Sequence, residues 1–452
     1  MSRFGVDLAF VLYATGMLCL VLSIVWRPVA GVFALIVLCP LQTVRYRMFE
    51  YPLGQSIVGW LLLGVVVGLV IRQGWPFGPT PWSGLVWGYL LFTFLSLCLG
   101  SFSLDQPLPF TTSNDRRLSE WGDYVQMPLL LLAVSAAVKR RWEIQVAVLL
   151  MCGTVMMMDL RLWNMIVGRD FTTYTHELRD QGTMGYAGAN GLAAFQAQFA
   201  CFALALAAVE KRFAAKCGFY ALAGFTALCL LYSLSRSGYL AFAGGCAFVG
   251  LVKERKLLVV LLLLALGWGI VAPEAVRTRI SSTYDSRAGT FDHSSELRLQ
   301  LWEEALPLFL SDPVLGKGFQ TYAHMENLGG YWDTHNLYLK TLVETGLLGL
   351  LLLLGLGLRI GWTGLRLFGE SRDGLNASIG LGIAAWLVCA GLANLFGDRW
   401  MYFQVQGYFW MLAGLLARAG ELERGGRGHM VEAGEEEAAA CGTEDGREPL
   451  PA

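Results

Sequence analysis

The stretch "LLVVLLLLALGWGIV" (257–271) decides the class of this protein. It is apolar throughout and lacks the polar–apolar alternation of a membrane β-barrel strand. Similar runs recur along the whole chain of 452 residues, of which 55% are hydrophobic and only 15% charged. Since roughly 20 apolar residues cross a bilayer as a helix, the sequence predicts an all-α, polytopic integral membrane protein.

We predict about twelve or thirteen transmembrane helices. The count depends on whether the short second run crosses the bilayer. The predicted runs are 7–25, 29–41, 56–71, 84–100, 123–138, 143–159, 189–209, 217–233, 237–252, 256–272, 337–359, 376–396 and 403–418.

The chain divides by composition into four parts. An N-terminal helix bundle (1–272) is followed by a long loop (273–336) and by C-terminal transmembrane helices (337–420). The last part (421–452) is rich in Gly, Ala and Glu, and we expect it to be a disordered cytoplasmic tail.

Basic residues indicate the orientation of the helices. Lys and Arg concentrate in alternate loops, such as "KRR" (139–141) and "KERK" (253–256), which the positive-inside rule places in the cytoplasm. By parity, the loop 273–336 lies on the outer, periplasmic side. We therefore expect the loop 273–336 to face away from the cytoplasm in a protein surrounded by membrane lipids; the resemblance described below implies the bacterial inner membrane.

Two function classes find no support in the composition. The ten cysteines are scattered without CxxC or metal-ligand spacing, and we expect neither a metal site nor a cofactor. The net charge of −1 gives no indication of nucleic-acid binding. The oligomeric state leaves no trace in the sequence.

The long outer loop contains a predicted helix. "SELRLQLWEEALPLFLSDPVLGKGF" (295–319) begins with a Ser cap and places Leu297, Leu301, Trp302 and Ala305 at helical spacing. This pattern predicts an amphipathic helix on the membrane face, ended by "SDP" and a Gly turn. "LGKGF" (315–319) lacks the second half of a Walker motif.

Polar residues at the outer ends of the helices form a candidate site. Arg236 lies in "SLSRSG", where one predicted helix ends and the next begins, and a charge at membrane depth is costly unless it has a function or a partner. Arg298 lies on the amphipathic helix, and His335 begins the pair "HN" before an apolar run. We add six residues as candidate substrate contacts or polar lining: Asn190, Trp302, Trp332, Asp333, Asn336 and Asp398.

Each candidate also has a purely structural explanation. Asn336 is a typical helix N-cap. Asp398 and Arg399 are explained equally well as a turn with an internal ion pair. Arg236 and Arg298 are acceptable as snorkelling or headgroup-anchoring residues. Trp302 and Trp332 fit the aromatic belt expected at any membrane interface.

Three motifs together resemble the O-antigen ligase and O-antigen polymerase superfamily. They are "LYSLSRSGYLAF", "RLQLWEEALPLFLSDPVLGKGF" and "THNLYLKTLVETGLLGLLL", within roughly 230–350. The resemblance implies that Arg236, Arg298 and His335 form the functional site. It also implies transfer of a glycan from undecaprenyl pyrophosphate to an acceptor on the periplasmic side. Asn190, in "GANG", resembles a polar position of such proteins more loosely.

The residue types agree with that chemistry. Arginines clamp phosphate oxygens through paired hydrogen bonds and keep their charge, which suits a leaving diphosphate. His335 would accept the proton of the acceptor hydroxyl, with Asp398 as the partner that fixes its tautomer. We expect a single, metal-independent displacement that inverts the anomeric centre.

Three functional alternatives follow from the sequence. Ligation of a finished glycan to lipid A-core and polymerisation onto a growing lipid-linked glycan use the same donor, and we favour ligation. From another class, a lipid or glycan transporter or flippase predicts charges at mid-bilayer on broken helices. Here nearly all charge lies at helix ends and in one outer loop, which favours a transferase.

Overall fold

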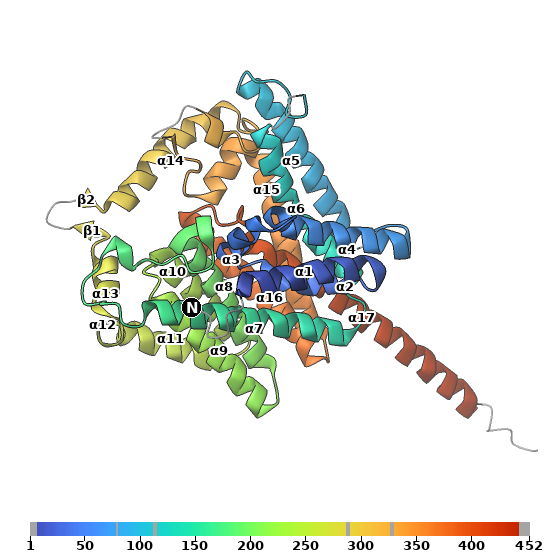
Figure 1. The fold of residues 1–452 in the computed structure, drawn as a ribbon. Helices are drawn as coiled ribbons and strands as arrows, with labels where there is room; N and C mark the ends of the chain where they lie inside the picture. Colours follow the sequence, from blue (N-terminus) through green and yellow to red (C-terminus); the bar gives the residue numbers. More distant parts are fainter. Residues whose placement is uncertain (1–6, 78–79, 112–114, 286–289, 326–329, 443–452) are drawn as a thin grey trace, which may run out of the picture.

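A computed structural model describes residues 7–77, 80–111, 115–285, 290–325 and 330–442 (Figure 1). In these ranges the protein is built almost entirely from α-helices, which confirms the all-α prediction. The exception is a hairpin in which β1 (Tyr284–Asp285) pairs antiparallel with β2 (Thr290–Phe291).

The helices follow one another along the chain. In order they are α1 (Leu8–Val25), α2 (Val29–Leu38), α3 (Gln42–Arg47), α4 (Ile57–Gln73), α5 (Ser83–Ser103), α6 (Arg116–Ala137), α7 (Arg141–Ile166), α8 (Gly188–Val209), α9 (Phe213–Leu231), α10 (Arg236–Val252), α11 (Lys256–Leu266), α12 (Trp268–Val271), α13 (Glu274–Ser281), α14 (His293–Ser311), α15 (Leu337–Glu370), α16 (Gly374–Ala393) and α17 (Phe403–Gly442).

Every predicted apolar run is helical, although the run 256–272 is divided at Gly267 into α11 and α12. Within the described residues, eight helices are long and apolar enough to cross a membrane. The short second run is α2, and with the following segment Gln42–Glu50 it forms a pair bent by 100° that would make a ninth span. The larger total of twelve or thirteen stays a prediction, because α10 and α11 are shorter apolar helices and α6 and α17 are not among the eight.

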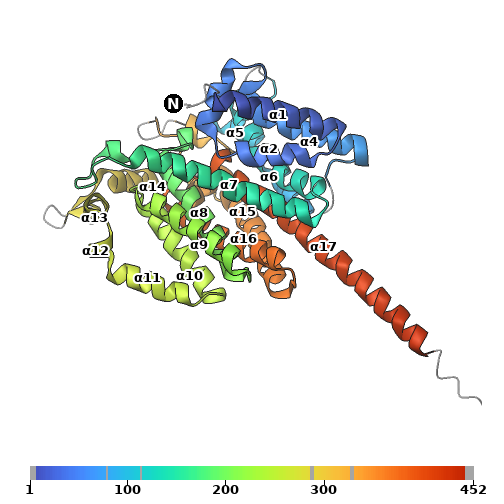
Figure 2. The ribbon, with the colours of Figure 1, turned by 60° about the horizontal axis from the view of Figure 1, so that its bottom comes forward.

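The core surrounds α8, which packs against α9, α10 and α16 (Figure 2). Small alanines along α8 let these helices approach closely, and its aromatic residues interlock with those of its neighbours. Phe195 meets Trp386 of α16 and Tyr408 of α17 with ring centroids 6.1 and 5.4 Å apart. The outer helices expose leucines and valines instead, as lipid-facing helices do.

The basic loops gather at one end of the bundle, here called the basic end. Arg27 pairs with Glu143, and Arg141 pairs with Asp373. The guanidinium of Arg418 donates to the carbonyl oxygen of Lys139 at 3.1 Å. The predicted cytoplasmic loop 139–141 is thus joined to the start of α16 and to α17. The opposite end, called the site end, carries α13 and α14.

The predicted amphipathic helix is present as α14, with small differences at its start. It begins at His293, and its N-cap is Asp292, not Ser295; the Ser295 hydroxyl donates to the Asp292 carboxylate. Leu301 and Ala305 are buried, and α14 packs on α15. Leu306 and Leu310 remain exposed, so the helix has one buried and one exposed apolar side.

A break divides α15, although its sequence predicts one continuous apolar helix. Gly346 has φ 64°, and the segment after α14 docks into the break. The amides of Leu347 and Leu348 donate to the carbonyl oxygens of Pro313 and Val314 at 2.8 and 3.2 Å. The loop thereby supplies the hydrogen bonds that the interrupted helix lacks and ties α14 to α15.

In the structure a helix extends over residues 421–442 of the expected tail, and the disorder of this tail stays a prediction. There α17 continues as a helix to Gly442, and its last part projects from the bundle in both views (Figures 1 and 2). Glu, Ala and Arg are strong helix formers, and they sustain a helix even without an apolar face to bury. The rest of the predicted tail, 443–452, lies outside the described residues.

Candidate functional site

Arg236 is the first residue of α10, and a strained turn presents it. Leu234, two residues earlier, is buried and has φ 56°, a left-handed conformation that costs an L-residue about 1–2 kcal/mol. The Arg236 guanidinium donates to Thr283 Oγ1 (2.5 Å), Asp292 Oδ2 (2.8 Å) and Ser294 Oγ (2.9 Å). The start of α10 is thereby fastened to the loop before α14.

Asp292 serves two arginines at once. Its Oδ2 also accepts a hydrogen bond from Arg279 of α13 at 3.1 Å. Burial opposes the charge of this carboxylate, but hydrogen bonds from Ser295 and Arg236 outweigh it and lower the pKa of Asp292 to about 2. The carboxylate is therefore ionised at neutral pH and balances only part of the positive charge around it.

Four arginines line one pocket at the site end, with a volume of about 280 Å³. They come from four separate elements: Arg179 from the α7–α8 loop, Arg236 from α10, Arg279 from α13 and Arg298 from α14. The Nε atoms of Arg179, Arg279 and Arg298 are buried and have no hydrogen-bond partner among the described residues. Buried donors without acceptors favour an anionic, oxygen-rich ligand.

Burial and the positive charge of this pocket lower the pKa of two of its own arginines. Burial, followed by the charges of Arg236 and Arg399, lowers the pKa of Arg298 to about 10. Burial also lowers the pKa of Arg179, and the nearby charges of Arg279 and Arg399 act in the same direction. An incoming phosphate would relieve this repulsion.

Asn190 belongs to the same pocket, as the sequence predicted. Its Oδ1 accepts hydrogen bonds from Arg179 (2.5 Å) and Ser235 (2.9 Å). The side chain lines the pocket at the start of α8 and orients Arg179 against the turn that carries Arg236. The amide oxygen is thus occupied by the protein's own donors.

His335 has a different partner from the one predicted. Its Nδ1 lies 2.6 Å from Oδ1 of Asp333, and the same oxygen accepts the backbone amide of His335 at 2.6 Å. Burial opposes ionisation of Asp333, but the hydrogen bond and charge of His335 and the charge of Lys340 lower its pKa to about 2. His335 has φ 52°, a second strained non-glycine residue in a motif of the site.

Asp398 is not the partner of His335. It is buried and pairs with Lys340 of α15, with Oδ2 2.9 Å from Nζ. Lys340 lies one helical turn into α15, and Glu344 one turn further approaches the same ammonium. A nearby lysine of opposite charge thus holds Asp398 in a structural ion pair.

Trp302 connects the two halves of the site. It lies one turn after Arg298 on α14, and its Nε1 donates to the carbonyl oxygen of Thr334 at 3.0 Å. Thr334 directly precedes His335, so α14 positions both the pocket arginine and the histidine loop. Leu337 adds a second connection, since its amide donates at 3.2 Å to Gly397, the neighbour of the pocket residue Phe396.

Two other candidates have mainly structural contacts. Asn336 is the N-cap of α15, and its Oδ1 accepts from the amides of Tyr338 and Leu339 at 3.0 and 3.1 Å. Trp332 is 54% exposed, and the guanidinium of Arg116 stacks 4.0 Å from the centre of its ring. Trp332 remains accessible to a ligand on its other side.

Sequence reasoning missed Arg179, Arg279 and Asp292. Each is a single charged residue in a loop or short helix without a motif of its own. Asp292 had one local signal, since an Asp directly before a helical pattern is a typical N-cap. Within the described residues, no group of three or more His, Cys, Asp or Glu side chains is arranged to hold a metal ion.

Fold and site together define a polytopic, all-α membrane protein with a cationic pocket beside a His–Asp pair. Residues 221–354 match the family model described as O-Antigen ligase, so this part of the chain is similar to that family and supports the resemblance to the O-antigen ligase superfamily. The match includes Arg236, Arg279, Asp292, Arg298 and His335, whereas Arg179, Asn190 and Asp398 lie outside it. No curated protein matches the chain.

Proposed function

We propose that this protein transfers a glycan from a polyprenyl diphosphate, of the undecaprenyl type, to an acceptor hydroxyl at the periplasmic face. The observation that carries the proposal is the pocket lined by four guanidinium groups, of which only those of Arg236 and Arg279 contact the carboxylate of Asp292. A diphosphate supplies the negative charge and the oxygen acceptors that this pocket lacks. The superfamily is of the glycosyltransferase kind, and a lipid-borne donor explains why the site opens at helix ends.

His335 acts as the general base in this proposal. Nδ1 carries a proton and donates a hydrogen bond to the carboxylate of Asp333. The lone pair of Nε2 is therefore free to accept the proton of the acceptor hydroxyl. The acceptor oxygen then forms a bond to the anomeric carbon as the bond from that carbon to the diphosphate oxygen breaks. One displacement of this kind inverts the anomeric centre.

The arginines stabilise the leaving group. As the glycosidic bond breaks, negative charge grows on the diphosphate, and fixed guanidinium groups in a partly dry pocket stabilise that charge without reorganising. Arg236 and Arg298 lie in the motifs that suggested the superfamily. Arg179 and Arg279 line the same pocket and would add to the clamp.

We favour ligation to lipid A-core over polymerisation of repeat units, and both remain within the superfamily. The chemistry at the donor is the same for the two reactions. The experiment that tests the reaction itself is glycan transfer from a purified undecaprenyl-pyrophosphate-linked donor in the presence of EDTA. Wild type is compared with His335→Ala, Arg236→Gln and Arg298→Gln at equal folded yield.

The expected outcome separates two roles. His335→Ala should lose at least about a hundredfold in kcat while it still binds donor, since general bases contribute about 10²–10⁴-fold. The arginine variants should lose both donor affinity and kcat. Unimpaired transfer in all three variants would contradict this assignment of the site. Movement of the donor across a vesicle membrane without glycan transfer would favour the transporter alternative.

A further inference from the structure

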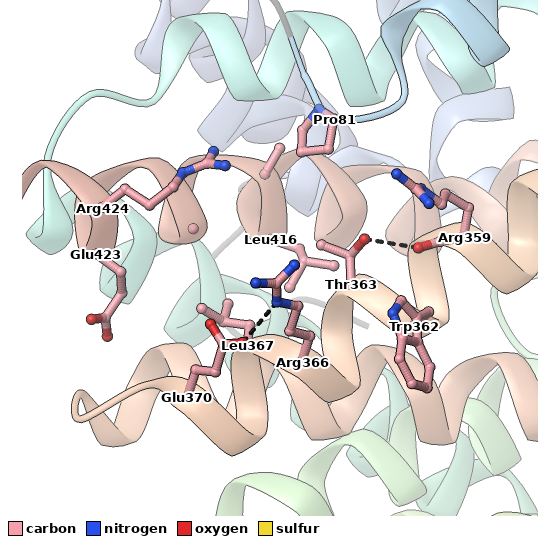
Figure 3. Close-up of a pocket in the computed structure, with 12 residues that line it drawn as sticks. Pro81, Arg359, Trp362, Thr363, Arg366, Leu367, Glu370, Leu416, Glu423 and Arg424 are labelled. Carbon is pink, nitrogen blue, oxygen red and sulfur yellow. Dashed lines mark hydrogen bonds and ion pairs between the residues drawn. The ribbon is translucent and has the colours of Figure 1, made fainter.

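A second charged cavity lies at the basic end, far along α15 from the site (Figure 3). It has a volume of about 430 Å³ and lies between the last third of α15, the middle of α17 and Pro81 before α5. Arg359 and Arg366 come from α15, and Arg424 comes from α17. None of these residues is used by the proposed reaction.

The three arginines differ in how far they are neutralised. Arg366 pairs with Glu370 at 2.7 Å on the same helix. Figure 3 shows Arg359 and Arg366 pointing from α15 towards α17, and Glu423 pointing away from them. The Glu423 carboxylate instead accepts hydrogen bonds from Ser371 and Asn376 at the start of α16. The cavity therefore keeps an excess of positive charge.

The remaining walls are apolar. Leu367, Leu416 and Ala417 line the cavity, and Trp362 stands at its rim with 67% of its surface exposed. Arginines beside leucines and an exposed tryptophan are typical of the depth at which phospholipid phosphates meet acyl chains. A soluble anion would fill only the charged part of such a cavity.

We propose that this cavity binds the phosphodiester headgroup of one anionic phospholipid from the leaflet at the basic end. Arg359 and Arg424 contact the phosphate, and an acyl chain lies along Leu367 and Leu416. The lipid would bridge α15 and α17, which diverge from each other at this level. The lipid would stabilise the C-terminal part of α15, whose N-terminus lies next to His335.

The test is native mass spectrometry of the full chain in detergent during stepwise delipidation. Wild type should retain one phosphatidylglycerol after phosphatidylcholine with the same acyl chains is lost. The variants Arg359→Gln and Arg424→Gln should each bind phosphatidylglycerol about fivefold more weakly, the loss expected per arginine near a lipid surface. The control is Arg372→Gln, an exposed arginine of the same end that does not line the cavity, which should bind as wild type.

Three results would overturn the proposal. If wild type retains the two lipids equally, the proposal is overturned, and this result does not depend on whether the variants fold. Equal weakening in Arg372→Gln would show general surface attraction. Displacement of the bound lipid by millimolar inorganic phosphate would identify a free-phosphate site, since phosphate lacks the acyl chain that the apolar walls hold.

Discussion

His335 Nδ1 lies 2.6 Å from Asp333 Oδ1, so the carboxylate two residues earlier fixes which ring nitrogen carries the proton. The remaining nitrogen, Nε2, is then the only one that can accept a proton from a substrate. Asp333 is buried and ionised, and it also holds the backbone of His335 in its strained conformation. The carboxylate of Asp333 thus orients the histidine ring, as it does in enzymes whose histidine base has a carboxylate partner.

Asp333→Asn should therefore slow the reaction without weakening donor binding. An asparagine keeps the size of the side chain but no longer stabilises the protonated imidazole, and we expect kcat to fall about ten- to a hundredfold. The measurement is kcat and donor KM at equal folded yield. Asp170→Asn, a change at an exposed carboxylate of the same end, is the control. A kcat equal to that of the control would remove Asp333 from the mechanism.

Arg279 and Arg277 lie on the same short helix and offer a matched comparison. Arg279 is buried and lines the pocket, whereas Arg277 pairs with Glu274 at the surface. Arg279→Gln should raise the donor KM about tenfold or more, because hydrogen bonds to charged groups contribute about 1.5–3 kcal/mol. Arg277→Gln should leave KM unchanged. Equal effects of the two changes would mean that α13 matters only for folding.

The amino-acid sequence predicts the helices of this protein better than it predicts the site. Apolar runs of sufficient length specify transmembrane helices directly, and the motifs around Arg236, Arg298 and His335 are local. Arg179 and Arg279 enter the pocket only because the α7–α8 loop and α13 pack against the turn before α10. The pairing of Asp398 was predicted incorrectly, because Lys340 lies inside an apolar run and its reach to the turn before α17 depends on how α15 and α17 pack.

Asp292 should make the site end sensitive to acid. The pKa of this carboxylate is about 2 in the folded protein and 3.8 as an ordinary aspartate, so its contribution is complete above about pH 4. It is lost as the pH falls through about 2. Between pH 4 and 2 the unfolding temperature of wild type should fall more steeply than that of Asp292→Asn. Parallel curves would show that the contacts with Arg236 and Arg279 do not stabilise the fold.

Alanine substitutions at Gly346, in the break of α15, and at Gly355, in its regular helical part, test whether the break is present. At Gly346 φ is 64°, and a Cβ atom would lie 2.3 Å from the carbonyl oxygen of Val314. Gly346→Ala should lower the unfolding temperature, since the left-handed conformation alone costs about 1–2 kcal/mol. At Gly355 a Cβ atom would meet nothing within 4 Å, and Gly355→Ala should stabilise the helix by up to about 1 kcal/mol. Equal melting curves for the two variants would contradict the break.

Lys340 should be essential for folding rather than for chemistry. Its ammonium lies 2.9 Å from Asp398 and 4.0 Å from Glu344, and all three side chains are buried. Lys340→Met leaves two carboxylates without a counter-ion, and breaking a buried pair in this way costs about 3–5 kcal/mol. The double variant Lys340→Met/Asp398→Asn removes one of the stranded charges and should recover part of that loss, measured as the unfolding temperature in detergent. If the double variant is less stable than Lys340→Met, Asp398 contributes through contacts other than this ion pair. If Lys340→Met melts like wild type but loses transfer, the lysine acts on the substrate instead.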